Sequence, residues 1–367
     1  MSVFLLMYFI IYGAMNAYVL LRARAAFAMG PRGSLVLGAL MLFMILAPMF
    51  VRMLEHAEQH ESARALAWVA YPYFGLVFLF FSAGVALEVF RFMAIGLKAL
   101  PQPTARLLFF IPLAWAVSLY AYGTWEAYDI RSEHVSISSA KVHRPVRIVQ
   151  ISDVHLGLMT TTAKVKRIVD AVAAASPDVL VCTGDLVDGG MPNSIELATL
   201  FKGLAKGPSY AILGNHEYYA GVDYSIAFMQ SAGFTVLRSS AVPADGLPIN
   251  VAGADFPSRW TTGSKPLTPD ARLFDGLPAD RFNLLLKHVP YVEQDGKTDL
   301  QLSGHTHKGQ IFPFGLLVRA AYPRIAGLYN IGPMKLYVSR GTGTWGIPIR
   351  VLAPPEITVI DITPAKG

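Results

Sequence analysis

The chain of 367 residues has a single cysteine and few charged residues, and both shortages limit what it can be. One cysteine excludes an intramolecular disulfide and a cysteine-based zinc site. Cys182 lies in the apolar run 179–183, so we expect a buried thiol. The net charge is +6, but no run of Lys and Arg of the kind that marks a nucleic-acid-binding arm is present, so we expect no nucleic-acid partner.

Charged residues make up 15% of the chain, and the first third is nearly free of Lys, Asp and Glu. An ordinary soluble protein has about 25% charged residues. Four apolar stretches reach the length of roughly 20 residues that crosses a bilayer. They cover residues 3–21, 35–51, 66–90 and 107–125. The first stretch lacks the basic start of a secretory signal. We therefore predict an all-α, four-helix transmembrane region in residues 1–130.

Glu88 is the one acid within a predicted span, and it stands three residues before Arg91. We expect it to form an ion pair, because a lone carboxylate in a membrane helix is costly. No other charge lies deep in a span, which argues against a channel or a pump.

The loops between the spans carry an uneven charge that predicts an orientation. The second loop is acidic, whereas the first and third are basic through Arg22, Arg24, Arg32, Arg91, Lys98 and Arg106. Because basic loops stay in the cytoplasm, the chain after the fourth span is expected outside. The predicted location is the cell (inner) membrane, multi-pass, with residues 143–367 on the extracytoplasmic face.

Residues 143–367 have the alternating strand and helix pattern of an α/β domain. Strands are expected at 147–152, 179–183 and 210–213, and helices at 164–175 and 195–204. Further strands are expected at 249–253, 282–287, 300–303, 334–339 and 356–361. We assign these later strands to a second sheet. The predicted fold is a two-sheet sandwich flanked by helices.

Five polar clusters follow predicted strands, where open α/β sheets place their ligands. They are Asp153-Val-His155, Gly184-Asp185-Leu-Val-Asp188, Gly214-Asn215-His216-Glu217, Lys287-His288 and Gly304-His305-Thr-His307. Histidine, carboxylate and amide oxygen together suit divalent ions such as Mn, Fe, Zn and Co. Two ions need about eight protein contacts with one carboxylate shared, and these clusters supply that number.

The clusters resemble those of the calcineurin-like metallophosphoesterase family over residues 147–362, with all five blocks in the family's order. The stretches 338–346 and 353–357 resemble its bacterial membrane-associated branch. The resemblance implies a metal-dependent phosphoric ester hydrolase (a phosphodiesterase or phosphatase) with two divalent metal ions (Mn, Fe, Zn or Mg). It implies one ion on Asp153, His155, Asp185 and His307, and the other on Asp185, Asn215, His288 and His305. Asp185 would bridge the ions, His216 would act on the leaving oxygen, and Asp188 would orient His216. Glu217 is expected only to solvate its loop.

Lys308 departs from the branch, which usually has glycine at this position after Gly-His-Thr-His. A lysine there places a cation next to the predicted metal site. The Lys308 side chain is expected either to contact a substrate phosphate or to point into solvent. Lysine would also strain the loop if the position needs a positive φ.

Residues 311–329 are apolar, contain Arg319 and Arg324, and include several helix breakers. They predict either a core segment or a membrane-dipping lip beside the site. Because spanning helices hold the domain at a membrane, the favoured substrate is a phosphate ester on a lipid or lipid-linked sugar.

The sequence leaves two other functions open. One is a UDP-diacylglucosamine-type pyrophosphate hydrolase of lipid A synthesis, which the predicted orientation disfavours because that substrate is cytoplasmic. The other is a non-catalytic membrane sensor or scaffold with an idle metal site. No protein partner is evident from the sequence.

Overall fold

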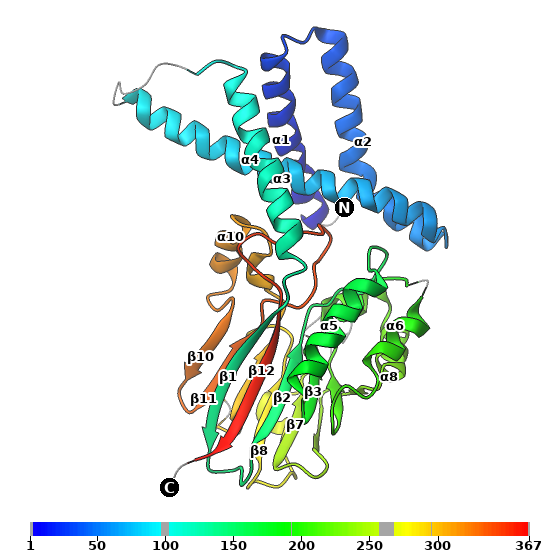
Figure 1. The fold of residues 1–367 in the computed structure, drawn as a ribbon, viewed down its shortest axis with the longest axis vertical. Coiled ribbons are helices and arrows are strands. Elements are labelled where there is room, and N and C mark those ends of the chain that lie inside the picture. Colours follow the sequence, from blue (N-terminus) through cyan, green and yellow to red (C-terminus); the bar gives the residue numbers. More distant parts are fainter. Residues whose placement is uncertain (1–2, 97–102, 192, 257–267, 295, 366–367) are drawn as a thin grey trace. The chain divides into compact units, whose positions relative to one another are not determined.

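The structure is a computed structural model that describes residues 3–96, 103–191, 193–256, 268–294 and 296–365 (Figure 1). It forms two compact units. The first consists of Met1–Trp125 and Gly346–Val351, and the second of Glu126–Trp345 and Leu352–Gly367.

The described residues of the first unit form four long apolar helices, as predicted. They are α1 (Val3–Ala26), α2 (Pro31–His56), α3 (His60–Gly96) and α4 (Leu107–Glu126). Within them, the spans long and apolar enough to cross a membrane are Leu5–Ala26, Pro31–His56, His60–Met93 and Leu107–Glu126, with mean hydropathies of 1.5, 2.4, 2.0 and 1.5. Most side chains of these spans are not buried within the protein, as expected of helices that face lipid.

Glu88 pairs with two arginines, which confirms the prediction of an ion pair. Arg22 of α1 contacts one carboxylate oxygen, and Arg91 Nη2 lies 2.6 Å from the other. The paired charge holds α1 against α3 and needs no transport role.

The segment Gly346–Val351 clusters with the helices, although in sequence it lies between the two parts of the second unit. The backbone N–H of Arg350 donates to the carbonyl of Gly123 in α4 at 2.9 Å. A Cβ at Gly123 would lie only 2.9 Å from the Arg350 carbonyl, so the close approach requires glycine.

The second unit is built on two six-stranded sheets, which confirms the predicted sandwich. The first sheet has the order β1-β12-β2-β3-β4-β5. Its strands are β1 (Arg131–Ser139), β12 (Glu356–Pro364), β2 (Val146–Ile151), β3 (Val179–Cys182), β4 (Ser209–Ala211) and β5 (Thr235–Val236).

The second sheet has the order β10-β11-β9-β8-β7-β6. Its strands are β10 (Gly327–Ile331), β11 (Met334–Val338), β9 (Leu300–Ser303), β8 (Phe282–Leu286), β7 (Ile249–Gly253) and β6 (Ser240–Pro243). The helices of this unit are α5 (Thr162–Ala175), α6 (Ser194–Phe201), α7 (Asn215–Ala220), α8 (Val222–Ser231), α9 (Asp270–Leu273), η1 (His307–Gly309) and α10 (Phe314–Ala321).

The strand at 356–361 was assigned to the wrong sheet. As β12 it runs parallel to β1 and antiparallel to β2, so it belongs to the first sheet. The prediction failed because β1 was not foreseen, and β12 lies between β1 and β2.

The core forms two layers because successive strand residues face opposite sides of a sheet. Val149 of β2 packs with Ile168 of α5 and Phe228 of α8 on the helix side. Ile148, its neighbour, packs with Leu284 and Leu302 of the second sheet. Cys182 is fully buried on the helix side, as predicted. This double burial makes the strands apolar throughout and directs the polar clusters to their ends.

Candidate metal centre

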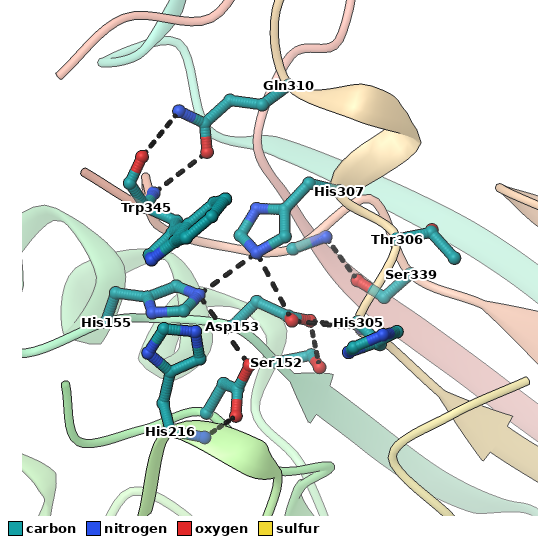
Figure 2. Close-up of polar contacts among 12 residues, drawn as sticks. Ser152, Asp153, His155, His216, His305, Thr306, His307, Gln310, Ser339 and Trp345 are labelled. Carbon is teal, nitrogen blue, oxygen red and sulfur yellow. Dashed lines mark hydrogen bonds and ion pairs between the residues drawn. The ribbon is translucent and has the colours of Figure 1, made fainter. Parts of the chain in front are cut away.

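The predicted polar clusters meet at the carboxyl ends of strands from both sheets. Figure 2 shows Asp153, His155, His216, His305 and His307 of this group. Asp153 and His155 follow β2, Asp185 and Asp188 follow β3, and Asn215 and His216 begin α7 after β4. His288 follows β8, and His305 and His307 follow β9. Strand pairing thus brings together residues that lie up to 154 positions apart in the sequence, the difference between 153 and 307.

One group of ligand atoms comes from Asp153, His155 and His307. The Nε2 atoms of His155 and His307 lie 3.0 Å apart, and His307 Nε2 is 3.4 Å from Asp153 Oδ1. Figure 2 shows the two rings turned toward each other. Nitrogens that converge in this way share a point at which one cation can be bound.

A second group comes from Asp185, His288 and His305. His288 Nε2 is 3.1 Å from Asp185 Oδ2, and His305 Nδ1 is 3.2 Å from His288 Nε2. The side-chain oxygen of Asn215 lies 3.0 Å from His305 Nδ1. His288 Nδ1 lies 2.8 Å from the Thr183 carbonyl, which leaves its Nε2 for a ligand.

Asp185 lies between the two groups. The oxygen that faces His288 is also 3.9 Å from His155 Nε2. The other oxygen accepts the backbone N–H of His216 at 2.9 Å. One carboxylate oxygen is therefore within reach of both groups.

The electrostatics of these residues fit divalent cations. Burial raises the pKa of Asp153, and Asp185 raises it further, against the effects of His288 and His155. Burial also acts to raise the pKa of Asp185, but His288 and His216 hold that pKa well below its usual range. Burial and the nearby His288 lower the pKa of His305 to about 3, so this ring is neutral and can act as a ligand. Asp185 outweighs burial and raises the pKa of His288 to about 10, so this ring must lose a proton before it binds a cation. Carboxylates with imidazoles form the donor set that borderline divalent ions prefer.

His216 and Asp188 form a pair beside the metal ligands. His216 Nδ1 hydrogen-bonds to Asp188 Oδ1. Burial acts to lower the pKa of His216, but Asp185 and Asp188 outweigh it and raise this pKa to about 9. The ring thus holds a proton at neutral pH. His155, Asp188 and His216 also come close enough to be a third ligand group, but Asp188 already binds His216.

The interpretation of Glu217 as a residue that only solvates its loop is wrong. Its side chain is fully buried and accepts backbone N–H groups from Asp185 at 3.0 Å, Val187 at 2.9 Å and Gly214 at 2.7 Å. Glu217 ties the loop after β3 to the loop after β4. The short local pattern gave no sign of this, because two of its partners lie about 30 residues earlier.

The backbone of the site is strained in a consistent way. Asp153, His155, Asp185, His305 and His307 all have positive φ, between 48° and 70°. Left-handed backbone costs a non-glycine residue about 1–2 kcal/mol. Such strain clusters at functional sites, where the surrounding structure holds it.

Glycines allow the strained loops to come close to one another. A Cβ at Gly304 would lie 2.2 Å from Asp153 Oδ2, and one at Gly214 would lie 2.2 Å from Asp185 Oδ1. No larger residue fits at either position.

Lys308 has φ 53°, so its position does require the left-handed backbone that glycine adopts most easily. The side chain is half-buried. No hydrogen bond or ion pair of its ammonium group occurs among the described residues.

Sequence reasoning missed two aromatic residues that contact the site. The Tyr322 hydroxyl lies 3.0 Å from His305 Nε2. The Trp345 ring lies 5.7 Å from the His216 ring, and its backbone exchanges two hydrogen bonds with Gln310. Both lie in stretches that the sequence had singled out, but only the fold shows that Tyr322 reaches the candidate ligand His305 and that Trp345 reaches His216.

Comparison with known proteins agrees with this geometry. Residues 146–309 match the family described as calcineurin-like phosphoesterase. An uncharacterized metallophosphoesterase of Aquifex aeolicus is 35% identical over 254 residues, which cover 67% of this chain and 97% of that protein. One from Helicobacter pylori is 29% identical over 326 residues, covering 86% of this chain and 85% of that protein.

A Danio rerio protein named as a transmembrane protein with metallophosphoesterase domain is 33% identical over 236 residues, covering 59% of this chain and 52% of that protein. Together with the four apolar helices, this similarity supports a membrane protein. The family match and the near-complete coverage of the Aquifex relative show that this chain belongs to the calcineurin-like metallophosphoesterase family.

Proposed function

We propose that the chain is a membrane-anchored phosphoesterase that works with two divalent metal ions, Mn, Fe, Zn or Mg. The observation that carries the proposal is the convergence of two ligand groups around Asp185, with the His216–Asp188 pair beside them. In this proposal, one ion is held by Asp153, His155, Asp185 and His307, and the other by Asp185, Asn215, His288 and His305.

Two such ions supply an activated water and stabilise the charge that develops on the oxygens of a phosphoryl group. The protein contributes the proton. Without metal the pKa of His216 is raised to about 9, and the protonated ring would donate its Nε2 proton to the leaving oxygen, while Asp188 binds Nδ1 and keeps the ring oriented.

The site would act on phosphate esters, with a diester on a lipid-linked or envelope molecule as the favoured class. The helices of the first unit keep the domain at a membrane, and this raises the effective concentration of membrane substrates. The charge of the loops supports an inner-membrane protein with its catalytic domain on the extracytoplasmic face. A reporter fused after residue 367 tests this orientation: alkaline phosphatase should be active and green fluorescent protein dark, and the reverse result would place the domain in the cytoplasm.

The activity is tested with the purified full chain on bis-p-nitrophenyl phosphate and p-nitrophenyl phosphate, with Mn, Zn, Mg or a chelator. Asp185→Ala should abolish turnover and metal binding together. His216→Ala should keep its metal and lose about 10²–10⁴-fold in kcat. The control is His134→Ala, because His134 is exposed on β1. Metal-independent turnover, or full activity of Asp185→Ala, would refute the two-metal proposal.

A further inference from the structure

The helix α10 has no buried residue, although its sequence is mostly apolar. Leu316 and Leu317 are 64% and 67% exposed. Phe314 in its first turn and Phe312 just before it are 44% and 48% exposed. Of the two interpretations of residues 311–329, a core segment does not describe this helix. A contiguous group of large apolar side chains on a surface indicates a binding partner.

The charges of this segment are all positive. Residues 311–329 contain Arg319 and Arg324 and no acidic residue. Arg319 is exposed in the last turn of α10, and Arg324 is half-buried after it. Neither guanidinium has a hydrogen bond or an ion pair to the described residues. Apolar side chains together with arginines complement an anionic lipid surface, which offers acyl chains and phosphate groups at nearby depths.

Both ends of the segment are anchored in the domain, so the fold itself holds the helix in its exposed position. Ile311 and Ile325 are each only 5% exposed. The Thr306 hydroxyl donates to the carbonyl of Ile325 at 2.7 Å. The apolar residues of α10 lie between these two buried residues and are therefore held at the surface.

The same segment reaches the candidate metal ligands. Tyr322 follows α10 directly, and its hydroxyl is 3.0 Å from His305 Nε2. At the other end, Gln310 exchanges two hydrogen bonds with the backbone of Trp345, whose ring stacks edge-on against His216. A surface that α10 binds would therefore lie beside the candidate metal site.

We propose that Phe312 and α10 form a membrane-binding lip that inserts into an anionic phospholipid bilayer and presents lipid phosphate esters to the metal site. The bilayer is the favoured occupant because this chain already spans one and the lip is apolar and cationic. The role of the lip in presenting a substrate rests on the proposed phosphoesterase function. Its insertion into a bilayer can be measured without any enzymatic activity.

Insertion is tested in full-length protein reconstituted into vesicles that contain phosphatidylglycerol. The native Cys182 is fully buried, so Leu316→Cys can be labelled selectively with a nitroxide. The matched control is Ile195→Cys, since Ile195 is 84% exposed on α6. We expect the label at 316 to be more accessible to oxygen than to a water-soluble nickel complex, and the label at 195 to show the opposite order. Equal nickel access at both positions would overturn the proposal, and so would a label at 316 that a protein or a second copy shields from both reagents.

Hydrolysis assays distinguish the role of the lip from that of the metal site. Leu316→Glu combined with Leu317→Glu should lower turnover of a bilayer phospholipid at least about tenfold and leave bis-p-nitrophenyl phosphate turnover unchanged; Ile195→Glu should change neither. Unchanged lipid turnover in the double variant would overturn the lip. Absence of turnover of every phosphate ester by the unaltered protein would count against the proposed function, while the nitroxide result would still decide insertion.

Discussion

Replacement of Glu217 tests how the loops that carry the metal ligands are held together. Its buried carboxylate accepts three backbone N–H groups, from Asp185, Val187 and Gly214. Glu217→Ala leaves all three without a protein acceptor. Glu217→Gln keeps the shape of the side chain but replaces one oxygen by an amide group that cannot accept. The two variants therefore remove different numbers of hydrogen bonds from the same place.

The magnitude follows from those contacts. A buried N–H without a partner costs about 1–3 kcal/mol, so the alanine variant should lose at least about 3 kcal/mol of stability and the glutamine variant about 1 kcal/mol. In a domain of this size each kcal/mol lowers Tm by about 2–4 °C. For these smallest losses of stability, Tm should fall by about 6–12 °C in Glu217→Ala and by about 2–4 °C in Glu217→Gln.

The assay is thermal unfolding of the full chain in detergent, scanned at one rate and followed by tryptophan fluorescence. The matched control is Glu196→Gln, since Glu196 is exposed on α6 and should leave Tm unchanged. Because Glu217 holds the Asp185 backbone, both Glu217 variants should also bind metal more weakly. The reasoning is refuted if Glu217→Ala unfolds within about 1 °C of the unaltered protein and binds metal equally well.

Three further predictions concern the site. Asp188→Asn should lower kcat and move the alkaline limb of the pH–rate profile to lower pH, because Asp188 raises the pKa of His216 and only the protonated ring donates; an unmoved limb would contradict this role. Tyr322→Phe should weaken metal binding about 10–100-fold by calorimetry, because its hydroxyl contacts a ring nitrogen of His305. Asp185 outweighs burial and raises the pKa of His288 to about 10, so the metal-free ring holds a proton at pH 7 that must leave when a cation binds. Metal affinity should therefore rise about tenfold per pH unit between about pH 6 and 8, with proton release in buffers of different ionisation enthalpy.

The controls for these predictions are equally specific. Tyr329→Phe removes a hydroxyl that donates to the Ala326 carbonyl at 3.0 Å, so it should leave metal affinity unchanged. If both tyrosine variants weaken metal binding equally, Tyr322 has no special role. A metal affinity that does not change with pH would show that His288 loses no proton on binding.

The sequence predicted that several of these polar clusters would lie close together, because each cluster is a local signal beside a strand. Asp153 and Asp185 each follow a buried strand, and parallel neighbouring strands end at the same edge of a sheet, so the meeting of these two residues followed from the pairing of β2 with β3. The spans and the Glu88 ion pair followed equally from apolar length and charge spacing.

Contacts between distant segments were decided only by the tertiary structure. The place of β12 between β1 and β2, the burial of Glu217 and the approach of Tyr322 to His305 each depend on how separate loops and strands come together. An apolar run such as 314–318 reads the same whether it is buried or exposed, and only the fold leaves α10 uncovered. Periodicity records which face of an element is apolar, whereas the partner of that face is set by long-range packing.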